Sequence, residues 1–309
     1  MLETWLTRNL DIEVPILGAP MGGRAGGTLA GEVSKAGGLG LLGAARYATA
    51  QWVAEEAAVA RELGGRFGVG LMTWSLDDDD SLLDAAIAQH PALITLSFGD
   101  PAAYVPRVHA AGIPVASQVN TLEDMRIAEL AGVDLIIAQG GEAGGHTGRI
   151  GTLPLLQELL DATDLPVAAA GGIGTGRGLA AVIAAGAEGA LIGTALLASP
   201  ETVGPDYARE RVVSAGSADT VYTSVFDRAR HQPWPDRWGG RAVVNDFTRD
   251  FHGTDTPVER LEEAYDPADP ALGVVYAGEA VGLVHAARPA GDVVRQIAAD
   301  AQRLLARFA

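Results

Sequence analysis

Cysteine is absent from this chain of 309 residues. Its absence excludes disulfides, thiolate zinc sites, Cys-ligated iron–sulfur clusters and a cysteine nucleophile. Lysine is almost absent too, since Lys35 is the one lysine among 22 basic residues. It lies in the first predicted helix of the repeat described below, on the side away from Leu29 and Val33, and should meet solvent. Aldolase and pyridoxal phosphate chemistry, which need a reactive lysine amine, are therefore disfavoured.

Positive charge is scarce, because the 22 basic residues are outnumbered by 39 acidic ones and the formal charge is −17. A nucleic-acid partner is therefore not expected, since neutralising phosphates needs clustered Lys and Arg. The six histidines include no close pair. Metal-dependent hydrolase chemistry therefore loses support, and no metal site is expected.

A long uninterrupted apolar stretch is missing as well. Residues 179–198 are almost wholly apolar, but Gly186 and Glu188 divide them into a helix, a turn and a strand. The N-terminus shows no basic segment followed by an apolar one, so no signal peptide is expected. We therefore expect a cytoplasmic protein with no membrane partner.

What the chain does have is a repeat of short apolar runs. Short apolar runs in which polar residues do not alternate with apolar ones are typical of strands buried on both faces of a parallel sheet. Helix-length stretches separate them, and Thr28, Thr49 and Thr121 are predicted N-caps. The runs begin near Pro15, Leu39, Phe67, Leu93, Ile113, Val133, Pro166 and Glu188.

Eight strand–helix units predict an α/β protein with the (β/α)8 TIM barrel fold. A doubly wound parallel sheet is the alternative, but it rarely needs eight near-equal units. The repeat stops near Pro200. We therefore predict a TIM barrel domain that binds a ligand over residues 1–199 and a smaller, mostly helical insertion domain over 200–275. Residues 276–309 should return to the barrel and end in an amphipathic helix.

Glycine dominates the predicted carboxyl ends of the strands, where barrel enzymes act. The segments Ala170–Gly174 and Ile192–Thr194 follow strands seven and eight. Barrels commonly build a phosphate site there from backbone N–H groups and a helix N-terminus. Because no lysine is nearby, amides and the Thr194 hydroxyl should hold the phosphate.

The longest gap between apolar runs surrounds the segment Gln139–Gly148, which contains Glu-Ala-Gly-Gly-His. A long loop on the active face of a barrel is typically functional. Its glycine pairs should allow His146 to bend over the barrel mouth, where an imidazole can transfer protons near neutral pH. The other five histidines are interpreted as structural or solvated.

None of the candidate site side chains named above can carry a redox reaction. A phosphate site beside a glycine-lined mouth therefore indicates a bound cofactor that supplies the chemistry. FMN is the natural candidate, because it combines one phosphate with a flat ring.

Several segments of the chain resemble the nitronate monooxygenases, formerly called 2-nitropropane dioxygenases. The resemblance is strong over residues 12–200 and weaker at Ala277–Leu283. The loop that ends at His146 is shared with flavin-dependent enoyl-acyl-carrier-protein reductases and with NADH:quinone reductases of this fold. The segments that carry the resemblance are Gly18–Gly23, Val33–Gly40, Gln139–Gly148, Ala169–Ile173 and Ile192–Ala195.

The resemblance implies an FMN-bound barrel in which His146 is the catalytic base. It places Ala19–Met21 along the flavin ring, Gln118 and Gln139 near its polar edge, and the glycines after strands seven and eight at the phosphate. The third strand departs from the family, because Gly70 stands where an asparagine normally contacts FMN. The implied cofactor-binding residues are Ala19, Pro20, Met21, Gly70, Gln118, Gln139, Gly145, Gly171, Gly172, Gly193 and Thr194.

The leading functional hypothesis is an FMN-dependent oxidoreductase that oxidises alkyl nitronates with O₂. A neutral nitroalkane would first have to lose its α-proton to His146. The alternative is an NAD(P)H-dependent reductase acting on an enoyl thioester or a quinone. A third reading, a flavin-binding sensor, is disfavoured because a passive binder has no need of a base. A monomer and a homodimer both remain open.

Overall fold

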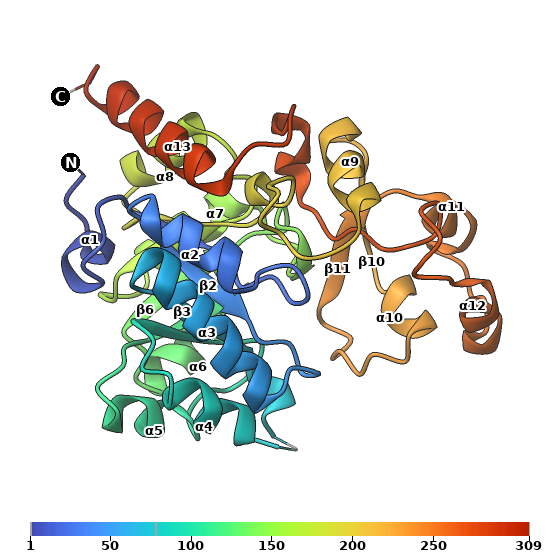
Figure 1. Cartoon of the computed structure of the whole chain (residues 1–309), viewed down its shortest axis with the longest axis horizontal. Coiled ribbons are helices and arrows are strands. Elements are labelled where there is room, and N and C mark those ends of the chain that lie inside the picture. Colours follow the sequence, from blue (N-terminus) through green and yellow to red (C-terminus); the bar gives the residue numbers. More distant parts are fainter. Residues whose placement is uncertain (1, 78, 309) are drawn as a thin grey trace.

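The eight predicted strands close into a parallel barrel in the computed structural model, which describes residues 2–77 and 79–308. Strand β1 pairs with both β2 and β9, so the sheet has no free edge. The TIM barrel prediction is therefore confirmed (Figure 1). The barrel strands are β1 (Ile16–Gly18), β2 (Leu39–Gly43), β3 (Gly68–Met72), β4 (Leu93–Ser97), β5 (Val115–Val119), β6 (Leu135–Gln139), β8 (Val167–Ala170) and β9 (Ala190–Ile192).

The strand residues are buried on both sides, as the uninterrupted apolar runs predicted. Alternate residues of one strand enter different clusters: Leu17 packs inside the barrel, whereas Ile16 packs against the outer helices. Helix α1 (Trp5–Asn9) contributes Leu6 to the inner cluster, and Gly189 of the segment before β9 lies against that side chain. The amino-terminal end of the barrel is therefore filled, and the opposite end is left for a site.

Helices alternate with the strands and surround the barrel (Figure 1). Thr49 and Thr121 cap α3 and α6 as predicted, but Gly26 rather than Thr28 occupies the N-cap of α2. Lys35 ends α2 with an exposed side chain. The outer helices are α2 (Gly27–Lys35), α3 (Ala50–Gly64), α4 (Ser81–Ile87), α5 (Val105–Ala110), α6 (Leu122–Leu130), α7 (Thr152–Leu160), α8 (Gly176–Ala184) and α13 (Ala290–Leu305).

The C-terminal helix α13 packs between α8 and α2 and so completes the ring. No helix in the described part of the chain is long and apolar enough to span a bilayer. Short 3₁₀ turns follow two strands at the active end, η1 (Thr73–Ser75) after β3 and η2 (Thr194–Leu196) after β9.

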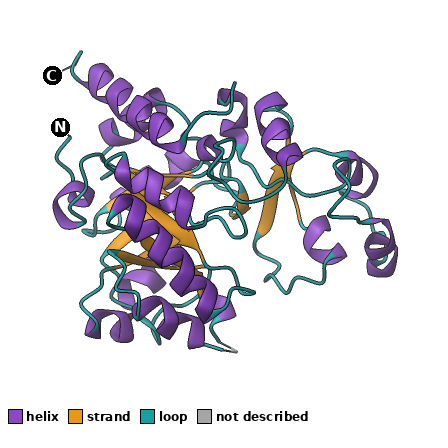
Figure 2. Cartoon of the chain, viewed as in Figure 1, coloured by secondary structure: helices purple, strands orange, loops and turns teal. Residues whose placement is uncertain are grey.

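The segment after η2 forms a separate lobe beside the barrel mouth (Figure 2). Helices predominate in it, but it also holds a small antiparallel sheet that the sequence did not indicate. The third strand of that sheet is β7 (Gly145–Thr147), which belongs to the loop after β6. The lobe contains α9 (Asp206–Ser214), β10 (Thr220–Thr223), α10 (Val225–Ala229), β11 (Gly239–Val243), α11 (Asp246–Phe251) and α12 (Val258–Ala264), followed by η3 (Glu279–Leu283).

Candidate active site

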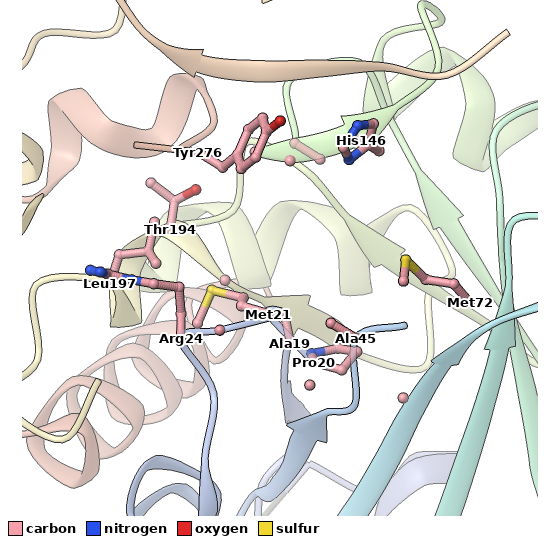
Figure 3. Close-up of a pocket in the computed structure, with 18 of the residues that line it drawn as sticks. Ala19, Pro20, Met21, Arg24, Ala45, Met72, His146, Thr194, Leu197 and Tyr276 are labelled. Carbon is pink, nitrogen blue, oxygen red and sulfur yellow. The ribbon is translucent and has the colours of Figure 1, made fainter. Parts of the chain in front are cut away.

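One cavity of about 620 Å³ opens at the carboxyl ends of the barrel strands. Figure 3 shows Ala19, Pro20 and Met21 on one side of it and His146 and Tyr276 on the other. The cavity brings together His146 and every residue that the sequence singled out for cofactor binding, from Ala19 through Thr194. No cluster of three or more potential metal ligands occurs among residues 2–77 and 79–308.

His146 lies in β7 and is held at the cavity wall by the insertion. Its backbone pairs with Gly240 of β11, and its Nε2 atom lies 2.9 Å from Oδ2 of Asp227. Both side chains are nearly buried, with 8% and 6% of their surface exposed. A carboxylate beside one ring nitrogen fixes the orientation of an imidazole and favours one tautomer.

Asp227, in α10, is the centre of a buried polar network. Its Oδ1 accepts hydrogen bonds from Nη2 of Arg230 and from the hydroxyl of Tyr276, each at 3.2 Å. Arg230 also donates to the Tyr276 hydroxyl at 2.9 Å. Burial, followed by the negative charge of Asp227, raises the pKa of Tyr276 well above its usual value, so this hydroxyl stays protonated. The carboxylate is thus neutralised and satisfied within the fold.

An aromatic wall fixes the plane of the His146 ring. Trp234 stacks on the imidazole with ring centroids 3.5 Å apart and an angle of 8° between the planes. Phe98, which follows β4, meets Trp234 edge-on and has a positive φ of 66°. Such backbone conformations cost free energy in a non-glycine residue and cluster at functional sites.

Gln139 joins the barrel to this wall. Its Nε2 donates to the backbone oxygen of His146, and its Oε1 accepts from Asn120. Asn120 in turn accepts from the indole N–H of Trp238 in the insertion. By contrast, the Gln118 side chain lines the cavity without a hydrogen-bond partner among the described residues. Gln118 is therefore the freer of the two amides to contact a ligand.

The opposite end of the cavity presents backbone groups. Gly171 and Gly172, after β8, both have positive φ, at 101° and 70°. Thr194 begins η2, and its hydroxyl accepts from the backbone N–H of Gly278, which leaves its own proton free. This grouping is the kind of amide- and hydroxyl-lined end that suits a phosphate.

Gly70 marks the floor of the cavity beside Pro20. A β-carbon added at Gly70 would lie 2.3 Å from Cβ of Pro20, so no side chain fits here without moving the proline. The hydroxyl of Thr95, on the neighbouring strand β4, is buried and has no partner within the described part of the chain. Thr95 lines the cavity as well, and its Oγ1 atom would lie 2.9 Å from a β-carbon at Gly70, so its hydroxyl faces the space that Gly70 leaves open.

Sequence reasoning missed Asp227, Trp234 and Tyr276. Each lies in or just after the segment that lacks a strand–helix rhythm, so no periodicity assigned it to a site. The one available signal was composition, because that segment combines tryptophans with several arginines.

Comparison with known proteins identifies the family to which this chain belongs. A model of the family described as nitronate monooxygenase matches residues 3–73 and 65–300. The chain belongs to the nitronate monooxygenase family. The nitronate monooxygenase of Neurospora crassa is 32% identical over an alignment of 344 positions, gaps included. The alignment covers 95% of this chain and 90% of that protein.

Two solved structures of relatives share the whole architecture. FabK from Thermotoga maritima superposes with a TM-score of 0.88 at 29% identity and covers 100% of this chain and 99% of its own. A nitroalkane oxidase from Streptomyces ansochromogenes gives a TM-score of 0.81 at 32% identity, with 98% and 99% covered. The chain is therefore a nitronate monooxygenase family member and a flavin-dependent oxidoreductase.

Proposed function

We propose that this nitronate monooxygenase relative binds FMN and oxidises alkyl nitronates with O₂, and that His146 acts as a base on neutral nitroalkanes. The observation that carries the proposal is the His146 ring on the cavity wall, tied through Nε2 to the buried Asp227. A pair of this kind holds a proton acceptor in a fixed orientation towards a ligand.

The cavity suits FMN at three points. Gly171, Gly172, Gly193 and Thr194 offer N–H and hydroxyl donors to a phosphate. Ala19, Pro20 and Met21 offer a flat apolar surface to the ring, with the side-chain-free Gly70 beside them. The unpartnered hydroxyl of Thr95 needs a hydrogen bond that a polar edge of the ring can supply.

When bound, FMN would supply the electron transfer between the nitronate and O₂. The residues of the chain handle the proton. Asp227 accepts the hydrogen bond from Nε2–H of His146, which leaves Nδ1 as the basic nitrogen. The C–H proton of a neutral nitroalkane passes to Nδ1, and the electron pair of that bond moves into the nitro group, giving the nitronate.

The test begins with the purified protein and its visible spectrum. We expect a yellow protein that releases one FMN per chain on denaturation, and O₂ consumption when an alkyl nitronate is added. A colourless protein that added FMN does not reconstitute would overturn the cofactor assignment. Flavin-loaded protein that consumes no O₂ with a nitronate would overturn the substrate assignment.

The second candidate is a reductase that uses NAD(P)H and acts on an enoyl thioester or a quinone. It is favoured by the extent of the cavity, whose wall continues past the proposed flavin residues to Gly204, Ala208 and Pro267 of the insertion. A small nitronate does not need that length. NADH oxidation with a quinone or an enoyl thioester, in protein inactive on nitronates, would establish this candidate instead.

A further inference from the structure

Arg24 presents a positive charge to the cavity that no described residue balances through an ion pair. It follows β1, lines the cavity and is half-buried. Within residues 2–77 and 79–308 its guanidinium makes no hydrogen bond and no ion pair, and its Nη2 atom is buried without a partner. In Figure 3, Arg24 lies at the far end of the site from His146.

The residues around Arg24 pack closely against its guanidinium but do not neutralise its charge. Gly204, at a φ of 118°, packs so closely that a β-carbon would lie 2.0 Å from Nη1 of Arg24. Asp206, two residues after Gly204 in the chain, pairs with Arg209. Burial, followed by repulsion from Arg209, lowers the pKa of Arg24. A half-buried cation in this position costs free energy unless an anion joins it.

Arg46 is a second arginine that lines the cavity without an ion pair among the described residues. It follows β2 and is exposed. Tyr47 lies beside it, also on the cavity wall and 69% exposed. Two such arginines at one mouth stand out in a chain with a formal charge of −17. They create a local positive region that attracts anions.

We propose that Arg24 and Arg46 form an anion-binding subsite for the phosphate or carboxylate of a second organic reactant. The subsite holds that reactant by its anionic end while its reactive end reaches the flavin. Arginine suits this task because its planar fork binds an oxyanion through two parallel hydrogen bonds. The inference rests on the proposed function, in which FMN fills the inner cavity and its phosphate lies at Gly171, Gly172 and Thr194.

Binding of inorganic pyrophosphate to the flavin-loaded protein tests the proposal, with calorimetry at low ionic strength. We expect pyrophosphate to bind the wild type and to bind Arg24→Gln roughly tenfold or more weakly, as for loss of one or two charge-assisted hydrogen bonds. Arg46→Gln should weaken binding less, because that residue is exposed. Arg303→Gln, in which the exposed arginine of α13 is changed, is the matched control and should bind like the wild type.

Two outcomes would overturn the subsite. Equal pyrophosphate affinity in the wild type and Arg24→Gln would show that the anion, if it binds, binds elsewhere. No binding to the flavin-loaded wild type would show that the mouth has no anion site. Neither result touches the flavin assignment, because the flavin content of each sample is measured first from its spectrum.

A second measurement separates a reactant's anion from the flavin's own phosphate. FMN and riboflavin are titrated into apoprotein of the wild type and Arg24→Gln. We expect Arg24→Gln to leave both affinities unchanged. A loss for FMN but not for riboflavin would assign Arg24 to the flavin phosphate and overturn the separate subsite. Should Arg24→Gln not fold, Arg24→Lys keeps the charge but loses the fork, and it should weaken pyrophosphate binding without affecting riboflavin.

Discussion

His146 and Asp227 lie 2.9 Å apart, Nε2 to Oδ2, although 81 positions separate them in the chain. The contact exists because β7, which carries His146, pairs with β11 of the insertion. The insertion therefore supplies both the backbone partner and the carboxylate of the proposed base. Its sheet is part of the active site as well as of the lobe.

Asp227→Asn should lower turnover of a neutral nitroalkane by roughly 10²–10⁴-fold, because the carboxylate that holds the base in its working tautomer is lost. Asparagine can keep the contact but no longer favours the tautomer with a basic Nδ1. Turnover of the pre-formed nitronate should change much less. Glu262→Gln is the matched control, since Glu262 pairs with the exposed His231 in the same lobe. Equal losses of nitroalkane turnover in the two variants would show that Asp227 does not orient His146 for catalysis.

His146→Asn should separate two activities of the flavin-loaded protein. Asparagine is similar in size, but it cannot accept a proton at neutral pH. Oxidation of a neutral nitroalkane should fall by roughly 10²–10⁴-fold, whereas oxidation of the nitronate should fall far less. Flavin content, measured in parallel, should remain near that of the wild type. If both substrates lose activity equally, His146 positions the ligand and does not take its proton.

Gly70→Asn introduces a side chain on the floor of the cavity, and we expect it to weaken flavin binding. The new β-carbon would meet the Pro20 ring at 2.3–2.4 Å, so the proline that should lie along the flavin must move. Titration of the apoprotein with FMN measures the effect. Gly151→Ala is the control, because a β-carbon there meets its neighbours at ordinary distances of 3.6 Å or more. Tighter FMN binding in Gly70→Asn would contradict the prediction, because it would show that Pro20 can move aside without losing its contact with the flavin.

Stability at alkaline pH should depend on Tyr276. The pKa of Tyr276 is raised in the folded chain by burial and by Asp227, from an ordinary value of 10.0. The folded state therefore keeps a proton that the unfolded state loses. The stabilisation is fully present below about pH 10 and declines as pH rises further, at up to about 1.4 kcal/mol per pH unit.

Urea unfolding on either side of about pH 10 measures that decline. Tyr276→Phe should lose less stability than the wild type over this range, although Tyr265, whose pKa burial also raises, retains part of the slope. Tyr47→Phe, at an exposed position, should follow the wild type. If the unfolding free energy falls equally steeply with pH in all three proteins, Tyr276 is not the cause of the decline.

The barrel could be predicted from the sequence because its strands are buried on both faces. Each strand therefore reads as an apolar run, as at Leu93–Ser97, whatever its neighbours are. The cavity walls followed from the same repeat, since glycines such as Gly171 fall where strands end. The partner of His146 could not be predicted in this way. Its position depends on the pairing of β7 with β11, and a lone aspartate in a segment without periodicity carries no sign of that pairing.

Two different parts of the chain supply the flavin contacts and the proton-handling residues of the proposed site. The proposed flavin contacts come from the barrel ends, whereas the carboxylate behind His146 and the Trp234 stack come from the lobe. Exchanging the lobe between relatives could therefore alter proton handling and reactant choice while electron transfer is retained.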